Sequence, residues 1–318
     1  MGEPTPIRIG ISACLIGHPV RYDGGHKRDS FLTDTLGRHV EFVTVCPEVE
    51  LGLGTPRETL RLERQAGEIR MVFAKTREDL TERMRAYSTK RVRRLAHDEL
   101  SGYVLKKDSP SCGMEQVKVH GGKGAPSTVG RGLFAEALLE RFPHLPVEEE
   151  GRLQDSRLRE NFVERVFAYR RLRDLFSKRW TVGELVSFHA AHELVLLAHS
   201  RTTYRELGRL VAKAKGMPRR ELAEQYEGEF MAALSRLATP KRYANVLQHM
   251  AGYFKKDLDA PSRAELAALI EDYRKGLVPL VAPLTLIRHH VRRLGVEYLA
   301  GQVYLDPHPK ELMLRNHV

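Results

Sequence analysis

Strand-like segments occur only in the first half of this 318-residue chain. Short runs rich in apolar and β-branched side chains predict strands at residues 7–13, 41–45 and 102–105. Apolar residues at helical spacing predict helices at 78–100 and 131–142. Because strands that alternate with helices usually pair in parallel, we predict a Rossmann-like α/β domain with a parallel sheet over residues 1–150.

The second half of the chain predicts helices alone. Thr181 and Glu184 have the spacing of a capping box, which should open a helix that runs to about His199. The other predicted helices are 155–179, 202–215, 219–237, 240–256, 261–275 and 284–294. We therefore expect an all-α domain over residues 151–318. The acidic run at 148–151 is typical of a solvated linker or turn.

Positive charge is concentrated in the predicted helical domain. Residues 1–150 contain 23 Lys and Arg against 22 Asp and Glu, whereas residues 151–318 contain 29 against 19. This uneven excess favours binding of a polyanion, with nucleic acid as the first candidate and a generally basic surface as the alternative. No uncharged apolar run is long enough to span a membrane, and the first seven residues do not resemble a secretory signal. We expect a cytoplasmic protein with no membrane or stable protein partner.

The chain has three cysteines, Cys14, Cys46 and Cys112, and each follows a predicted strand. Cys14 and Cys46 come directly after their strands, and Cys112 lies seven residues beyond the third. Because the carboxyl ends of parallel strands meet at one edge of a sheet, where ligands bind in such folds, we expect the three thiols to converge there.

Three converging thiolates suggest a metal centre. Thiolate ligands alone are typical of zinc or of an iron–sulfur cluster, and a set of three protein ligands leaves one position open for a substrate. The alternative is three buried, inert thiols, which is a common fate of free cysteine. The Gly-, Pro- and Ser-rich segments around the cysteines favour the metal site.

The residues around the cysteines resemble a known family. The strings SACLIGHPVRYDGGHK, CPEVELGLGTPRE and LKKDSPSCG are similar to the cysteine motifs of the thiouracil desulfidases. The strings FHAAHELVLLAHS, NVLQHMAGYFKK, EDYRKGLVPLVAPLTLIRHH and QVYLDPHPKELMLRNHV resemble the helical domain fused to them in bacterial tRNA 4-thiouridine desulfidases. The resemblance covers nearly the entire chain. It implies a 4Fe-4S cluster bound by Cys14, Cys46 and Cys112, with tRNA as the partner.

The implied reaction is a non-redox desulfuration of 4-thiouridine in tRNA to uridine. A thiocarbonyl sulfur is a soft donor, so an open iron would bind it in preference to a carbonyl oxygen and polarise C4. Glu48 matches the family's Cys-Pro-Glu glutamate and is the candidate acid or base. Its alternative roles are pairing with Arg57 and capping a helix.

Four further residues complete the predicted site. The resemblance favours Ser109 as the second catalytic residue, and Ser111, Asp23 and Lys106 are predicted to contact the substrate. Both serines and Asp23 also lie in sequences typical of turns, and Lys106 could simply be solvated.

Two further patterns concern RNA binding. Arg170, Arg171 and Arg173, together with cations at helix ends, are the predicted phosphate contacts. The spacing of large apolar side chains over 243–254 indicates a packed helix face. Two other functions stay open: desulfuration of free thiouracil or a thionucleotide, and nucleic-acid binding by a metal-containing regulator without turnover.

Overall fold

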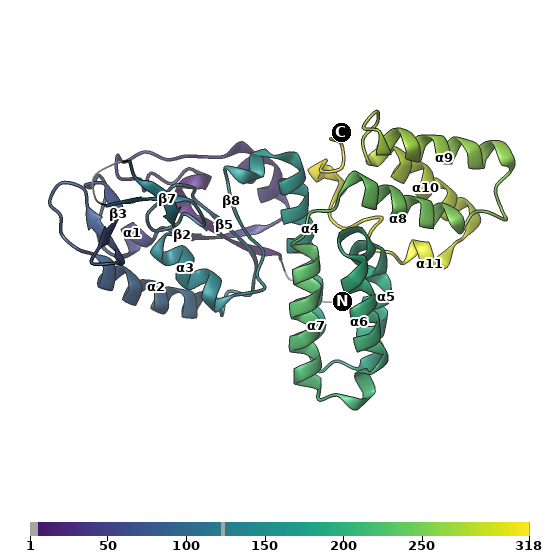
Figure 1. The fold of residues 1–318 in the computed structure, drawn as a ribbon, viewed down its shortest axis with the longest axis horizontal. Helices are drawn as coiled ribbons and strands as arrows, with labels where there is room; N and C mark the ends of the chain where they lie inside the picture. The colour runs from purple at the N-terminus through teal and green to yellow at the C-terminus, as the bar shows by residue number, and fades with distance from the viewer. Residues whose placement is uncertain (1–5, 122–124, 318) are drawn as a thin grey trace. The chain divides into compact units, whose positions relative to one another are not determined.

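The computed structural model describes residues 6–121 and 125–317 (Figure 1). The chain divides into two compact units, residues 1–155 and 156–318. No described helix is both long and apolar enough to cross a membrane.

A four-stranded parallel sheet forms the centre of the first unit. In spatial order its strands are β2 (Glu41–Val45), β1 (Arg8–Ser12), β5 (Leu100–Leu105) and β8 (Val147–Glu149). Ser12 lies opposite Val45, and Ile11 lies opposite Val104, so β1, β2 and β5 end close to one level. The predicted parallel α/β sheet is confirmed, and the narrower Rossmann-like assignment stays a prediction.

The middle strand β1 carries a tight contact in the core. Ile9 and Ile11 are completely buried, and Gly10 between them faces the ring of Tyr103 on β5. A Cβ atom on Gly10 would lie 2.2 Å from that ring, so only glycine fits. The buried, apolar character of these strands is the reason that the sequence predicts them.

A second sheet in this unit was not predicted. In spatial order its strands are β4 (Glu68–Phe73), β3 (Leu60–Gln65), β6 (Val117–His120) and β7 (Ser127–Gly130). β3 and β4 are joined by Ala66 and Gly67, whose φ angles of 48° and 90° are those a two-residue type I′ hairpin needs. Leu62 and Met71 face a small core of their own. Polar and charged residues interrupt the apolar side chains of these strands, so their apolar signal is weak.

Three α-helices complete the first unit: α1 (Pro47–Glu50), α2 (Thr81–Leu95) and α3 (Leu133–Arg141). α2 and α3 pack against each other (Figure 1). α2 is shorter than the predicted helix at 78–100, because β5 already begins at Leu100. Short 3₁₀ and π turns lie at Ala13–Ile16, Phe31–Thr35, Leu36–Arg38 and Arg152–Gln154.

The prediction of a solvated linker or turn at 148–151 is wrong for Glu148 and Glu149 and correct for Glu150 and Gly151, which form a turn. Glu148 and Glu149 belong to β8 and are 4% and 3% exposed. Their carboxylates are buried because each has a partner: Arg152 donates to Glu148 (2.7 Å), and the backbone N–H of Met114 donates to Glu149 (2.7 Å). The acidic run is therefore part of the sheet edge.

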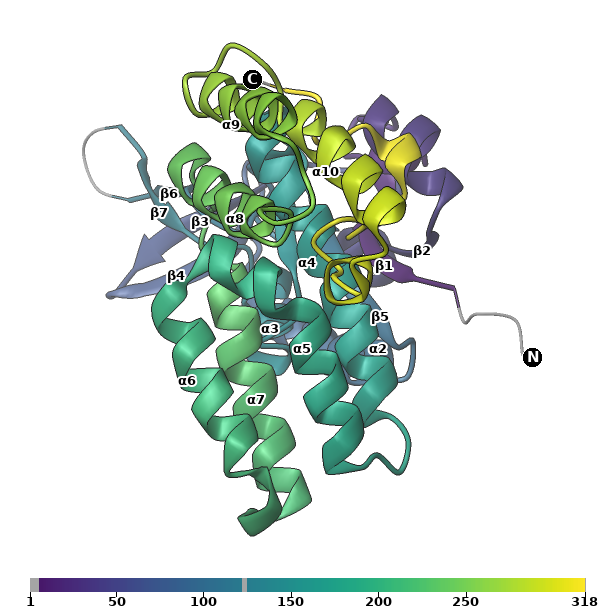
Figure 2. The same cartoon turned by 90° about the vertical axis from the view of Figure 1, so that its right-hand side faces the viewer.

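All regular secondary structure among the described residues of the second unit is helical. The helices are α4 (Ser156–Phe176), α5 (Val182–His199), α6 (Arg201–Ala212), α7 (Arg219–Leu234), α8 (Pro240–Gly252), α9 (Ala260–Arg274), α10 (Val281–Leu294), α11 (Glu297–Ala300) and 3₁₀ turns at Ala214–Gly216 and Lys310–Leu312. α5, α6 and α7 lie side by side, and α8 packs against α9 (Figure 2). The all-α prediction is confirmed.

Two local predictions in this unit are also confirmed. Thr181 and Glu184 form the capping box, with Glu184 N–H donating to Thr181 Oγ1 (3.2 Å) and Thr181 N–H donating to Glu184 Oε2 (2.7 Å). Leu247, Met250 and Phe254 are completely buried, as expected of a packed helix face.

Candidate active site

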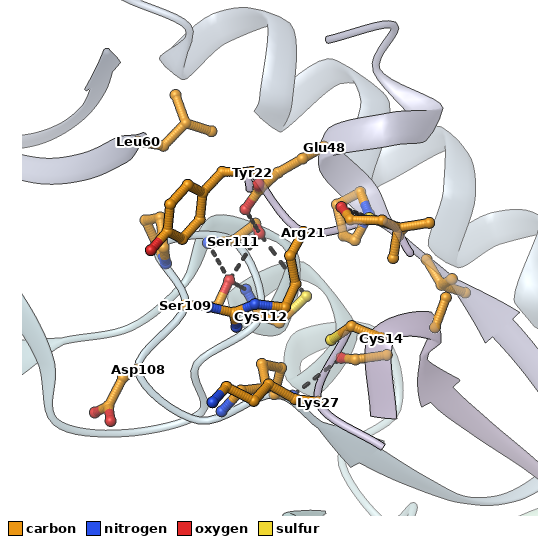
Figure 3. A pocket seen from close by; sticks show the side chains of 18 of the residues that line it. Cys14, Arg21, Tyr22, Lys27, Glu48, Leu60, Asp108, Ser109, Ser111 and Cys112 are labelled. Carbon is orange, nitrogen blue, oxygen red and sulfur yellow. Dashed lines mark hydrogen bonds between the residues drawn. The ribbon is translucent and has the colours of Figure 1, made fainter. Parts of the chain in front are cut away.

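One cavity in the first unit is lined by all three cysteines, of which Cys14 and Cys112 are labelled in Figure 3. Cys14 follows β1, Cys46 follows β2 and precedes α1, and Cys112 lies in the loop after β5. These strands are neighbours in the parallel sheet, so their carboxyl ends bring the three loops together. The cavity has a volume of about 390 Å³.

Burial dominates the chemistry of the three thiols. Cys14 is 8% exposed and Cys112 is 5% exposed, whereas Cys46 is half-buried. Loss of solvation raises the pKa of Cys14 to about 11, and it raises the pKa of Cys46 and of Cys112 as well. The charge of the neighbouring thiolates raises the pKa of Cys14 and Cys112 further. The free thiols are therefore protonated at neutral pH, and a bound metal would displace their protons.

Cations line the same cavity. Burial is the main cause of the raised Cys14 pKa, and the charges of Lys106 and Arg21 oppose it. The Lys106 ammonium group also binds the carboxylate of Glu150 and the carbonyl of Lys107 (2.9 Å). Lys27 reaches the cavity from the loop after Cys14. This positive lining would offset the charge of three thiolates.

The donor set fits an iron–sulfur cluster. Among residues 6–121 and 125–317, no group of three His, Cys, Asp or Glu side chains is placed to hold a metal ion. A tetrahedral zinc ion with Zn–S bonds of about 2.3 Å needs its sulfurs about 3.8 Å apart. A four-iron cluster binds each thiolate on a different iron and so accepts a wider spacing. The three thiols that line this cavity can supply three such ligands.

Glu48 is held at both carboxylate oxygens. Ser111 Oγ donates to Oε1 (2.7 Å), and Arg57 Nε donates to Oε2 (2.9 Å). The Glu48 side chain is 13% exposed and that of Arg57 is 5% exposed, so the pair is shielded from water. The pairing with Arg57 that the sequence left open is present, and the bond from Ser111 directs the same carboxylate toward the cysteine loop.

Ser109 shapes the loop that carries Cys112. Its Oγ accepts hydrogen bonds from the backbone N–H of Cys112 (3.1 Å) and Ser111 (3.3 Å), and it lies 3.0 Å from Ser111 Oγ. The Ser111 carbonyl in turn accepts from Phe134 N–H (3.0 Å) at the start of α3. Gly132 packs against that carbonyl, because a Cβ there would lie 2.4 Å from the oxygen. Helix α3 therefore anchors the Cys112 loop.

Lys106 lies in the wall of the cavity, whereas Asp23 lies outside it. Lys106 lines the cavity, and its backbone N–H donates to Ser12 Oγ (3.0 Å). Asp23 does not line it: its Oδ1 accepts from Gly25 N–H (3.0 Å) in an exposed turn. That hydrogen bond, with a smaller effect from Arg21, lowers the pKa of Asp23. The structure thus brings together every predicted site residue except Asp23.

Sequence reasoning missed the carboxylates that hold the cysteine loop. Glu150 accepts from Lys107 N–H (2.7 Å) and pairs with Lys106, while Glu149 binds Met114, two residues after Cys112. These partners lie 35 to 44 residues apart in sequence, so no local pattern connects them. Only the pairing of β5 with β8 brings them together.

One predicted phosphate contact in the helical unit is wrong. Arg171 Nη2 donates to the carbonyl of Pro307 (2.6 Å), so its guanidinium binds the protein's own backbone. Arg170 pairs with Asp174 (2.8 Å), and Arg173 is exposed on α4. The sequence pattern of a basic helix does not show whether an arginine points to solvent or donates a hydrogen bond to a buried backbone carbonyl.

Each half of the chain matches the model of a protein family. Residues 9–150 match the family described as 2-thiouracil desulfurase, and residues 193–309 match a family described as protein of unknown function, DUF1722. Residues 9–150 therefore belong to the 2-thiouracil desulfurase family.

Individual relatives each match about half of the chain. YbgA of Escherichia coli strain K12 is 38% identical over 153 residues, which is 48% of this chain and 90% of YbgA. YbbK of Bacillus subtilis strain 168 is 28% identical over 146 residues, which is 44% of this chain and 95% of YbbK. The solved 4Fe-4S-dependent thiouracil desulfidase TudS is 33% identical, with a TM-score of 0.39, over 47% of this chain and 94% of TudS.

Proposed function

We propose that this protein removes the sulfur of 4-thiouridine in tRNA, leaving uridine, at a 4Fe-4S cluster held by Cys14, Cys46 and Cys112. The observation that carries the proposal is the set of three thiols around one cavity with a fixed carboxylate, Glu48, in a domain that matches the 2-thiouracil desulfurase family. The 4Fe-4S dependence of the related TudS supports the same cofactor here.

When bound, the cluster would supply a soft Lewis acid for the thiocarbonyl sulfur. The protein's own contribution begins with charge: Arg21, Lys27 and Lys106 line the cavity and offset the thiolates. Ser109 holds the backbone of Cys112, which sets the direction of that thiol. These contacts exist before the substrate enters, so the site is preorganised.

Glu48 is the proton acceptor in this proposal. Ser111 and Arg57 orient its two oxygens, so a water beside the base meets a fixed carboxylate. Water adds to C4 as Glu48 takes one of its protons. The remaining O–H proton passes to the sulfur, the C–S bond breaks, and the sulfur leaves as hydrosulfide. A carbonyl replaces the thiocarbonyl and no electron is transferred, so the reaction is a hydrolysis.

The helical unit is the proposed tRNA-binding part. Residues 151–318 carry an excess of Lys and Arg, 29 against 19 Asp and Glu, which attracts phosphate in a salt-dependent way. The thiolated base must leave its stack to reach a cavity of about 390 Å³. We place the enzyme in the cytoplasm, with tRNA as its partner and without association with a membrane.

The first experiment measures the cofactor. Iron and acid-labile sulfide are determined per chain after anaerobic reconstitution of the native protein, the Cys112→Ala variant and a Ser235→Ala control. We expect about four irons with matching sulfide in the native protein and the control, and a large loss in Cys112→Ala. Zinc alone, or no metal with all thiols open to alkylation, would overturn the proposed centre.

The second experiment measures the reaction. 4-Thiouridine-containing tRNA is incubated with the loaded protein and digested, and its nucleosides are quantified. Glu48→Gln should lower the rate by about 10²- to 10⁴-fold with iron content unchanged, since it removes the proton acceptor. Glu41→Gln, an exposed glutamate on β2, is the matched control. Intact 4-thiouridine in the presence of a full cluster would contradict the proposal.

Free thiouracil is the second candidate substrate. The name of TudS gives thiouracil as that protein's substrate, and the cavity is large enough for a single base. Parallel assays with 2-thiouracil, 4-thiouridine monophosphate and thiolated tRNA separate the candidates. Turnover of the free base without turnover of tRNA would favour thiouracil and leave the basic helical unit with another role.

A further inference from the structure

The helical unit contains a second cavity, far in sequence from the cysteine motifs. Its volume is about 320 Å³, within the range of small-ligand pockets. It is lined from α4, α8, the end of α9 and the segments around them, all within residues 157–317. Apolar side chains of Leu237, Val278 and Leu280 and the rings of Tyr243 and Tyr273 form much of its wall. Such a wall suits a flat aromatic group.

One buried carboxylate, that of Glu160, lines this cavity with one of its oxygens lacking a hydrogen bond. Glu160 on α4 is 5% exposed, and its Oε1 has no hydrogen-bond partner within the described part of the chain. Arg315 Nε and His317 Nε2 each lie 3.5 Å from a Glu160 oxygen, which is ion-pair distance and too long for a good hydrogen bond. A buried carboxylate oxygen without a hydrogen bond is costly, so a donor from a ligand would stabilise it.

Cations line the same cavity. Arg157, Arg274 and Lys275 contribute to its lining, and Arg274 and Lys275 are about half exposed. Both pair with Glu271, so together they keep one net positive charge. The cavity therefore combines an aromatic and apolar wall, a buried acceptor and exposed cations. A ligand that matches all three has a flat ring, adjacent N–H donors and an anionic group.

We propose that this cavity binds one guanine nucleotide. The ring N1–H and the 2-amino group of guanine are adjacent donors, and both can bind one carboxylate, Glu160. Adenine and uracil do not offer two adjacent donors of this kind. The phosphate lies toward Arg274 and Lys275. A free nucleotide and an unpaired guanosine in an RNA supply the same chemistry, and the proposal does not depend on the desulfuration.

Calorimetric titration of the full chain tests the base preference without any mutation. Guanosine monophosphate (GMP) should bind with one site per chain. Inosine monophosphate, which lacks the 2-amino group, should bind about tenfold more weakly, since it loses one hydrogen bond to a charged acceptor. Adenosine and uridine monophosphates should bind more weakly still. Equal affinity for adenosine monophosphate and GMP would overturn the assignment.

Variants then test the residues. Glu160→Gln should lower GMP affinity at least about tenfold, because an amide cannot accept both donors. Glu265→Gln, an exposed glutamate on α9, is the matched control and should not change it. Arg274→Ala should weaken GMP more than guanosine, which has no phosphate. An unchanged affinity in Glu160→Gln, with folding verified by circular dichroism, would overturn the proposal.

Two kinds of probe distinguish a free guanine nucleotide from an unpaired guanosine in RNA as the ligand. RNA hairpins with one loop guanosine, or inosine in its place, are compared with GMP. Tight binding of GMP assigns the cavity to a free nucleotide, and binding of the guanosine hairpin alone assigns it to RNA. The Cys112→Ala chain, which lacks a proposed cluster ligand, should bind the same probes equally well, so this test is independent of the desulfidase assay. Binding of no guanine probe refutes the site.

Discussion

Replacement of Glu160 by glutamine should stabilise the helical unit at alkaline pH and have little effect near pH 4.5. Burial raises the pKa of this carboxyl group from 4.5 to about 7, with the charge of Arg315 opposing and that of Glu164 adding to the increase. The folded protein therefore holds this proton to a higher pH than the unfolded chain does. Glutamine has nearly the shape of the protonated side chain and does not titrate.

The sign and size follow from the two pKa values. Stability associated with the protonated form is fully present below the unfolded pKa of 4.5, and it is lost as the pH rises through about 7. A difference of about 2.5 pKa units at about 1.4 kcal/mol per unit corresponds to about 3 kcal/mol above pH 8. The native protein loses this stability as the pH rises, whereas the Glu160→Gln variant does not.

Urea denaturation followed by tryptophan fluorescence measures the effect. Trp180 is the chain's single tryptophan, and it packs against Phe176 in the helical unit, with ring centroids 5.1 Å apart. With an m-value of about 2 kcal/mol/M, the unfolding midpoint of Glu160→Gln should rise by about 1.5 M at pH 8.5. The two curves should nearly coincide at pH 4.5. Equal midpoints at both pH values, or a shift confined to acid pH, would refute the reasoning.

The same assay connects stability with the proposed nucleotide site. Donors from a bound guanine favour the carboxylate form of Glu160, so saturating GMP should stabilise the native protein at pH 8.5. Glu160→Gln, which binds GMP weakly, should gain little. The stability lost through this residue is typical of groups that serve binding rather than folding.

Three further substitutions test the packing and the caps. Gly10→Ala places a Cβ 2.2 Å from the Tyr103 ring and should lower the free energy of unfolding by about 2 kcal/mol or more, measured by urea denaturation with circular dichroism. Thr181→Ala removes the capping box and should cost about 1 kcal/mol in the fluorescence assay, whereas an unchanged midpoint would show that the cap is dispensable. Gly132→Ala brings a Cβ to 2.4 Å from the Ser111 carbonyl, so it should lower the iron content after reconstitution. Full iron loading would contradict the anchoring of the cysteine loop by α3.

Sequence patterns predicted the elements whose signal is local. β1, β2 and β5 are short apolar runs, and the helices of the second unit have caps and periodic apolar faces. The sequence does not predict the hairpin of β3 and β4, because charged residues interrupt its apolar side chains, although Ala66 and Gly67 form the turn that such a hairpin needs. β8 was missed because a run of glutamates resembles a solvated linker.

The residues of the candidate site also fall into those that the sequence predicts and those that only the fold brings together. The position of Cys14, Cys46 and Cys112 after strands predicted their convergence, since the ends of parallel strands share one edge. The two groups that fix Glu48, Ser111 and Arg57, lie 63 and 9 residues away, and their simultaneous contact depends on the packing of three loops. Asp23 is the predicted residue that the fold leaves in a turn outside the cavity.

By itself the sequence determined the two-part architecture, the places of the thiols and the uneven charge, because periodicity, strand ends and composition are local properties. The tertiary structure alone decided which charges are buried and what they bind. Glu160 belongs to a helix rich in arginine, where a glutamate is expected at the surface, yet it lies 5% exposed beside a cavity. Burial and partnership arise from contacts between distant segments, and no local pattern encodes them.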